Sequence, residues 1–216
     1  MNKDSRIRNS ARNVFYGSIS QVVMLLLQFL SRTIFIKLLG SEYLGINGLY
    51  SNILNVLSLA ELGIDNVMLF SLYKPVADND FRKINSLLKY YKKLYIKISL
   101  TVLLLGLSVV PFLKFMVTSE LNLSAVILYY ILFLFNSVAS YFAVYRSALI
   151  KADQNNYIID NYTTAFVALR YILQIAFLLI TKSFATYLII QLICTFLTNF
   201  SLSQEAKKLY PFIKET

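Results

Sequence analysis

Two carboxylates, Glu61 and Asp65, lie inside an apolar stretch that is long enough to cross a membrane, Ile46–Tyr73. Their spacing of four residues puts both side chains on one face of a helix. An ionised group near the bilayer centre costs roughly 2.5–3.5 kcal/mol on insertion scales, so acids there need a partner, a proton or a water-filled cavity. The two acids therefore indicate a pathway for an ion or a polar substrate.

Other polar residues extend this face along the same stretch. They recur at steps of three or four residues, at Asn47, Ser51, Asn55, Ser58, Glu61 and Asp65. A polar stripe on a membrane helix is typical of a helix that lines a path through the membrane. Asn47 and Asn55 are therefore candidate pathway residues beside the two acids.

Two arginines lie inside other apolar stretches. Arg32 is seven residues before the end of the first stretch, and Arg170 is eight residues into the fifth. At 1.5 Å per residue, Arg170 and Asp65 lie about 12 and about 13 Å from the same predicted membrane boundary. This matching depth leads to the hypothesis of an Asp65–Arg170 ion pair.

The groups beside these charges suggest what the pathway carries. Gln28 lies one turn before Arg32, and Gln174 lies one turn after Arg170. Guanidinium groups bind phosphate or pyrophosphate through paired hydrogen bonds, and amides suit sugar hydroxyls. Carboxylates in a membrane are able to take up a proton or Na⁺. The side chains thus indicate a polar substrate. They leave open whether the substrate is an anion and whether its movement is coupled to an ion.

Composition places these residues in a membrane protein. The chain of 216 residues is 57% hydrophobic and 15% charged, whereas soluble domains carry about 25% charged residues. It has no histidine, and its one cysteine, Cys194, lies in an apolar run and reads as a buried small hydrophobe. We predict no metal, no cofactor and no enzymatic activity, because no catalytic constellation appears.

The apolar stretches predict an all-α integral membrane fold, a six-transmembrane-helix bundle over residues 1–202. Each stretch reaches the roughly 20 residues that a bilayer crossing needs. The predicted spans are Val14–Leu39, Ile46–Tyr73, Leu94–Val117, Leu123–Tyr145, Tyr162–Thr181 and Phe184–Leu202. Gly106 and Pro111 are expected to bend or loosen the third span.

The basic residues predict the orientation. Sixteen Lys and Arg residues fall in the amino terminus, the even-numbered connections and the tail, against three in the odd-numbered connections. The positive-inside rule then puts both termini of this multi-pass protein in the cytoplasm. The net charge of +10 is mainly this topology signal, so no nucleic-acid partner is expected.

Two cytoplasmic segments have separate predictions. Residues 78–93 have helical apolar spacing among basic residues, which predicts an amphipathic helix lying on the anionic inner leaflet, with lipid head-group recognition as the alternative. Asp78, Asn79 or Asp80 is expected to cap its start. Residues 203–216 are predicted to be a cytoplasmic tail or the start of a linker.

Several motifs together resemble Wzx-type polysaccharide flippases. The resemblance extends over essentially the whole chain. The motifs are RTIFI at 32–36, LGSEYLGI at 39–46, LSLAELGID at 57–65, LYKP at 72–75, YYKKLY at 90–95, RSALIKADQ at 146–154 and AKKLYP at 206–211. The resemblance implies the multidrug/oligosaccharidyl-lipid/polysaccharide exporter superfamily. Its members move undecaprenyl-pyrophosphate-linked oligosaccharides across the membrane by alternating access, for capsule or O-antigen polymers.

The same resemblance implies a second half. The family has two lobes of about six helices each, with the lipid-linked oligosaccharide between them, so six spans lead us to expect a fragment or a dimer-forming half. Arg32, Glu61, Asp65 and Arg170 become cavity candidates of the amino-terminal lobe. The alternatives are a drug or cation antiporter of the same superfamily, and a non-transporting interaction subunit. A membrane enzyme is disfavoured because the longest connection is basic and amphipathic.

Overall fold

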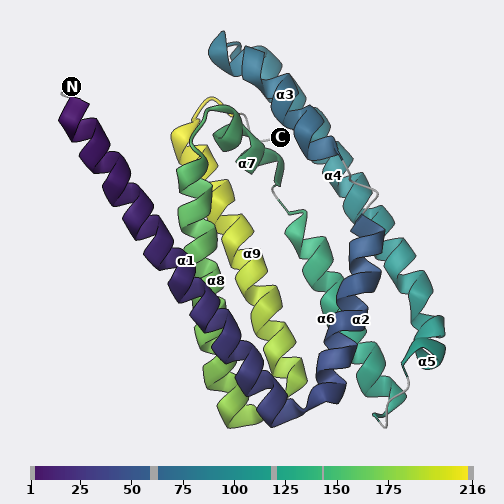
Figure 1. The fold of residues 1–216 in the computed structure, drawn as a ribbon. Coiled ribbons are helices and arrows are strands. Elements are labelled where there is room, and N and C mark those ends of the chain that lie inside the picture. The colour runs from purple at the N-terminus through teal and green to yellow at the C-terminus, as the bar shows by residue number, and fades with distance from the viewer. Residues whose placement is uncertain (1–2, 59–62, 118–120, 143, 214–216) are drawn as a thin grey trace.

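The computed structural model describes residues 3–58, 63–117, 121–142 and 144–213, with side chains described from Gln21 onwards. Within these ranges the secondary structure is entirely helical (Figure 1). The elements are α1 (Lys3–Leu39), α2 (Ser41–Ser58), α3 (Ile64–Ala77), α4 (Phe81–Val109), the 3₁₀ helix Val110–Phe112, α5 (Leu113–Met116), α6 (Leu123–Ser140), α7 (Val144–Ala152), α8 (Asn156–Thr181) and α9 (Phe184–Leu209).

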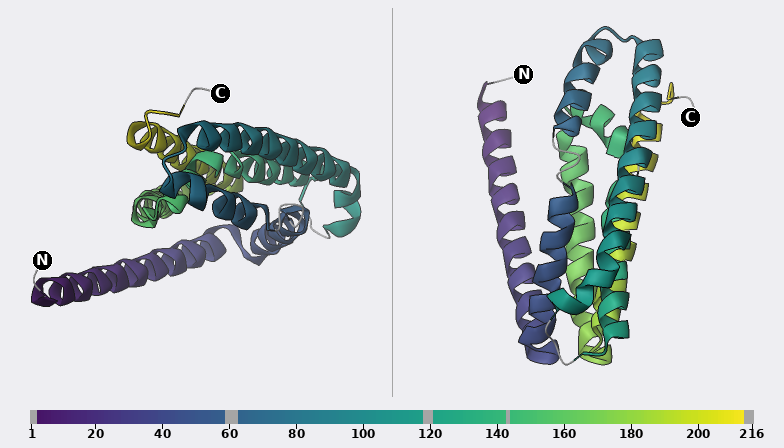
Figure 2. Two further views of the ribbon diagram at one scale, coloured as in Figure 1. Left: turned by 90° about the horizontal axis from the view of Figure 1, so that it is seen from above. Right: turned by 90° about the vertical axis from the view of Figure 1, so that its right-hand side faces the viewer.

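The long helices run alternately up and down in one bundle. In Figure 1, α1, α4 and α8 descend, whereas α2 with α3, α6 and α9 ascend. The start of α1 and the end of α9 therefore lie at the same end, as the side view in Figure 2 also shows. Helix α8 packs between α1 and α9, α9 packs against α6, and α4 packs against α3 and α6.

Five of the described helical segments are long and apolar enough to cross a membrane, which makes the chain a multi-pass all-α membrane protein. They are Gln21–Leu39, Phe81–Met116, Leu123–Ser140, Asn156–Thr181 and Phe184–Leu209. The expected boundary between the last two holds because Lys182 is left-handed, with φ 47°. Ser183 then caps α9 by accepting from the Thr186 amide at 3.4 Å.

The second predicted span does not form one helix. Helix α2 ends at Ser58, and Gly63, with φ 87°, stands directly before α3. This left-handed conformation interrupts a right-handed helix and is one that glycine adopts at little cost. The expectation of a continuous helix over Ile46–Tyr73 was therefore wrong. Glu61 itself lies outside the described residues.

The predicted amphipathic segment is the first part of a membrane helix. Asp80 caps α4, because its Oδ1 accepts a hydrogen bond from the Lys83 amide at 3.0 Å. From Phe81 the helix continues without a break to Val109. The expected separate surface helix over 78–93 was wrong, since the segment and the third span share one axis.

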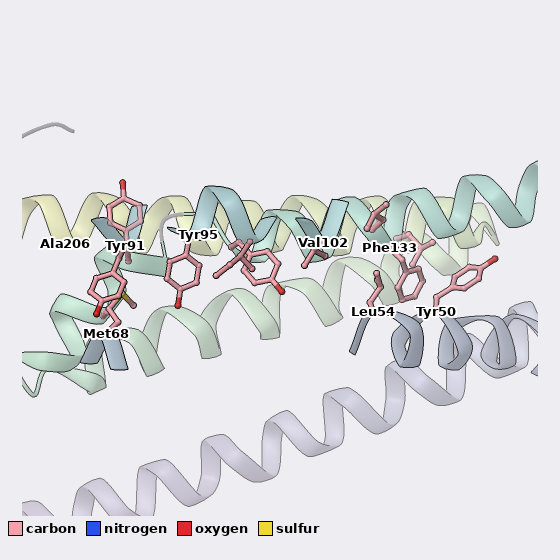
Figure 3. Packing of buried hydrophobic residues seen from close by; sticks show 14 of the residues in the cluster. Tyr50, Leu54, Met68, Tyr91, Tyr95, Val102, Phe133 and Ala206 are labelled. Carbon is pink, nitrogen blue, oxygen red and sulfur yellow. The ribbon is translucent and has the colours of Figure 1, made fainter. Parts of the chain in front are cut away.

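The apolar face of this segment packs against protein. Leu88 and Tyr91 on α4 are buried in the same cluster as Met68 and Leu72 on α3. Figure 3 shows Met68 beside Tyr91, and the Tyr91 hydroxyl lies 3.0 Å from Ser71 Oγ. Helix α3 therefore takes the place that the sequence analysis assigned to lipid.

Helices α4 and α6 approach closely at Gly106. A Cβ atom at this position would lie 2.3 Å from Leu134 Cδ1, so only glycine fits without movement of that leucine. The Tyr130 hydroxyl on α6 also donates to the Gly106 carbonyl at 2.9 Å. Gly106 thus serves close packing, whereas Pro111 lies where the α-helix changes to a 3₁₀ helix.

The end of the chain packs on the bundle. Helix α9 runs to Leu209, beyond the predicted end of the sixth span. Asn85 Nδ2 on α4 donates to the Phe212 carbonyl at 3.0 Å, and the ring centroids of Phe81 and Phe212 lie 4.2 Å apart. The described part of the predicted tail is therefore attached to α4.

Candidate functional site

A polar cavity of about 170 Å³ lies between α1, α2, α8 and α9. We call it the arginine cavity. Its lining comprises Gln28, Ser31, Arg32, Phe35, Leu44, Asn47, Tyr171 and Tyr187. Three predicted site residues, Gln28, Arg32 and Asn47, thus come together from two helices.

Tyr187 on α9 connects this cavity to the second arginine. Its phenol lines this cavity with Ser31 and Arg32, and it is within electrostatic range of both Arg32 and Arg170. These arginines belong to α1 and α8, which pack against each other. Two guanidinium groups that are far apart in sequence therefore act on one phenol.

Arg170 keeps unused hydrogen-bonding capacity. Its Nε is buried and has no hydrogen-bond partner among the described residues, and its Cζ lies 5.0 Å from the centre of the Tyr171 ring. The residue borders a cavity of about 190 Å³ that Thr163, Thr198 and other residues of α6, α8 and α9 line. A polar ligand there would have a guanidinium donor available.

Gln174 lies one turn further along α8 and is 1% exposed. Its Nε2 donates to the Tyr187 carbonyl at 3.2 Å, and its Oε1 has no partner among the described residues. This predicted site residue therefore supports the backbone of α9 at Tyr187 and does not line the arginine cavity itself.

The charge around Tyr187 is positive. Among the described residues, neither Arg32 nor Arg170 forms an ion pair with an acid. Two cations without a counter-charge are costly in a medium of low dielectric constant, and an anion reduces that cost. The arginine cavity is therefore suited to a negatively charged group such as phosphate.

Asn55 belongs to a neighbouring cavity of about 310 Å³ between α2, α6 and α9. Its polar lining is Ser51, Asn55, Ser58, Asn136, Ser137, Ser140 and Gln191. The described part of the predicted α2 stripe therefore faces cavities, with Asn47 in the arginine cavity and the rest in this one.

A polar stripe on α9 was missed by the sequence analysis. Tyr187, Gln191, Thr195, Thr198 and Asn199 line successive cavities along the helix. Thr195 Oγ1 donates to Asn136 Oδ1 at 2.8 Å, which links α9 to α6. The signal was present in the sequence, because Tyr187, Gln191 and Thr195 recur at steps of four and both Thr198 and Asn199 follow Thr195 by three or four residues, as in the α2 stripe.

Asp65 lies apart from both arginines. Its exposed carboxylate accepts a hydrogen bond from the Tyr95 hydroxyl on α4, and no ion pair joins it to Arg170. Asp65 is on α3, which packs against α4 and α7, whereas Arg170 is on α8, which packs against α1 and α9. The hypothesis of an Asp65–Arg170 pair was wrong, because equal depth does not make two helices neighbours.

The arginine cavity and the two neighbouring cavities form one polar face, which is built by α1, α2, α6, α8 and α9. No protein-family model, no curated protein and no solved structure matches this chain. The site combines a cavity lined by Arg32 with amide and hydroxyl groups along α2, α6 and α9.

Proposed function

We propose that this protein forms one lobe of a flippase that moves undecaprenyl-pyrophosphate-linked oligosaccharides across a bacterial cytoplasmic membrane. In this proposal α2 and α3 together make the second of six crossings, and both ends of the chain are cytoplasmic. The polymer supplied is a capsular or O-antigen-type polysaccharide.

The observation that carries the proposal is the pair of arginines beside Tyr187, which have no acidic partner among the described residues. Guanidinium groups match the oxygens of a pyrophosphate, and the pyrophosphate supplies the missing negative charge. The amides and hydroxyls of the neighbouring cavity, including Asn55 and Gln191, suit the hydroxyls of a sugar.

Exposure of the polar face supports a second wall for the site. Gln28, Arg32 and Asn55 are all exposed, although they lie in or beside membrane-spanning segments. Such groups are costly against lipid, so in our proposal a further lobe or a second copy of the chain covers them. Movement between the two walls would carry the substrate across, coupled to a proton or sodium ion.

A gene deletion tests this function. In cells that depend on the gene, its loss should cause lipid-linked oligosaccharide to accumulate on the cytoplasmic side, and the intact gene should reverse this. Unchanged oligosaccharide levels together with altered tolerance to drugs would instead favour the antiporter. The cationic cavity argues against that alternative, because it repels cationic substrates.

The same system distinguishes a non-transporting subunit. For a flippase lobe, substitution of the arginines must reduce translocation while the protein remains in the membrane at its normal level. Translocation that persists at the wild-type rate in such variants would identify the chain as an interaction subunit.

A further inference from the structure

A cavity of about 560 Å³ lies between α4, α6, α7 and α9, away from the arginine cavity, with which it shares no lining residue. We call it the apolar groove. Ile96, Phe135, Phe142 and Phe196 form much of its wall and are exposed at the surface of the bundle. Since α4, α6 and α9 are long and apolar enough to cross the membrane, we infer that the groove opens towards the lipid acyl chains.

Two cations lie at one end of the apolar groove. Lys92 on α4 and Arg146 on α7 line it together with Tyr145. Lys92 belongs to the first half of α4, which descends, and Arg146 belongs to α7, which follows the ascending α6, so both cations come from the upper part of the bundle (Figure 1). This is also the end where the charge pattern predicts the cytoplasm.

The Arg146 side chain makes contacts that fix it at this end, but one of its hydrogen-bond donors is unused. Its Nη1 donates to Ser203 Oγ on α9, and its Cζ lies 5.5 Å from the centre of the Tyr145 ring. Its Nε is buried without a hydrogen-bond partner among the described residues. A buried donor without an acceptor is costly, and a phosphate oxygen is a strong acceptor for a guanidinium group.

We propose that the apolar groove binds an anionic glycerophospholipid of the inner leaflet. One acyl chain lies along the aromatic wall, and the phosphate and anionic head group lie against Arg146 and Lys92. The groove volume falls in the roughly 300–1,000 Å³ range of ligand sites. Basic pockets between membrane helices on the cytoplasmic side have the charge that anionic lipid head groups require.

This lipid site would stabilise the bundle. The lining comes from α4, α6, α7 and α9, so a bound lipid contacts both α4 and α9. The inference is independent of the proposed flippase activity, because it concerns a resident lipid and not the transported molecule.

Native mass spectrometry tests the proposal. The full chain is purified in detergent, incubated with equal amounts of phosphatidylglycerol and phosphatidylcholine, and analysed for bound lipid. The wild-type protein should retain more phosphatidylglycerol than phosphatidylcholine. Lys92→Gln and Arg146→Gln should each reduce that preference about fivefold, the equivalent of about 1 kcal/mol per basic residue near an anionic lipid.

Matched variants separate charge at the groove from charge elsewhere. Lys93→Gln and Lys151→Gln remove exposed cations from the same helices outside the groove and should leave the preference unchanged. Ala139→Phe fills the groove without a change in charge and should reduce retention of both lipids. Arg146→Lys keeps the charge and should keep most of the preference, even if the contact with Ser203 is weakened.

Three results would overturn the proposal. One is equal retention of the two lipids by the wild-type protein. Another is unchanged preference in a folded Lys92→Gln variant, in which a half-buried cation of the groove is neutralised. The third is an equal reduction in Lys93→Gln or Lys151→Gln, which would assign the preference to net charge.

Discussion

The hydroxyl of Tyr95 on α4 donates a hydrogen bond to the carboxylate of Asp65, the second residue of α3. This contact joins the two helices just after Gly63, where the left-handed backbone separates α3 from α2. A carboxylate acceptor makes the hydrogen bond stronger than one between neutral groups. The pair therefore helps to hold α3 against α4.

The Asp65–Tyr95 contact predicts energetic coupling between these two residues. Asp65→Ala and Tyr95→Phe should each lower the stability of the protein, and the double variant should lose less than the sum. We expect a coupling energy of about 0.5–3 kcal/mol from a double-mutant cycle of unfolding in detergent. A parallel cycle with Asp65→Ala and Arg170→Ala should be additive. Coupling in that second cycle would contradict the observed arrangement.

The arginine cavity predicts the effect of charge on translocation. Under the proposed flippase function, Arg32→Gln in this cavity and Arg170→Gln beside it should each reduce translocation of lipid-linked oligosaccharide roughly tenfold or more, since each removes a guanidinium donor to the anion. Arg32→Lys should be intermediate, because an ammonium group keeps the charge but loses the planar pair of donors. Translocation is measured as reversal of oligosaccharide accumulation in cells lacking the gene.

The control for this experiment is Lys182→Gln, which removes an exposed cation at the turn between α8 and α9. It should retain normal translocation. If it is as defective as Arg32→Gln at equal protein levels, the effect belongs to overall charge and the role of the arginine cavity is refuted.

Close packing at Gly106 predicts a large effect of one methyl group. Gly106→Ala should destabilise the protein by about 1–3 kcal/mol, because the new Cβ overlaps Leu134 Cδ1. Gly48→Ala is the matched control, since nothing lies within 4 Å of a Cβ at that helical position. Because alanine has a higher helix propensity than glycine, Gly48→Ala should raise the free energy of unfolding by up to about 1 kcal/mol. Thermal unfolding in detergent measures both.

A compensating variant tests the cause of that loss. Leu134→Ala removes the atoms that the new Cβ meets, so Gly106→Ala combined with Leu134→Ala should be more stable than the two separate losses predict. Simple additivity would mean that the contact with Leu134 is not what limits the position.

The attachment of the chain end predicts a titration at high pH. Burial raises the pKa of Tyr210 to about 12, and its 2.8 Å hydrogen bond to Asp153 Oδ2 adds to the rise. The ordinary pKa of tyrosine is about 10, so the contribution of Tyr210 to stability is complete below pH 10 and is lost as pH rises towards 12. Absorbance of the phenolate, compared with that of Tyr210→Phe, should show this late titration.

Asp153→Asn is the companion variant for this titration. It removes the negative charge beside Tyr210 but leaves Tyr210 buried. The pKa of Tyr210 should therefore fall only part of the way towards 10. An unchanged titration curve would show that Asp153 does not act on this phenol.

Local chemistry made much of the fold predictable. The boundary between the last two spans follows from apolar runs separated by Lys182 and Ser183, and the start of α4 follows from Asp80 as its cap. The spacing of polar residues in α2 also predicted that this face lines cavities. These features depend on neighbours within one or two helical turns, which a sequence displays directly.

Lateral neighbours in the bundle were decided by the tertiary structure alone. The sequence determined that Arg32 and Arg170 lie inside helices that are long and apolar enough to cross a membrane, but depth along a helix does not specify which helix lies beside it. Because α3 packs on α4, Asp65 accepts a hydrogen bond from Tyr95. Because α1, α8 and α9 pack together, both arginines lie within electrostatic range of Tyr187. The physical reason is that hydrophobicity sets the position along the membrane normal, whereas the fit of side chains such as Gly106 and Leu134 sets the helix order.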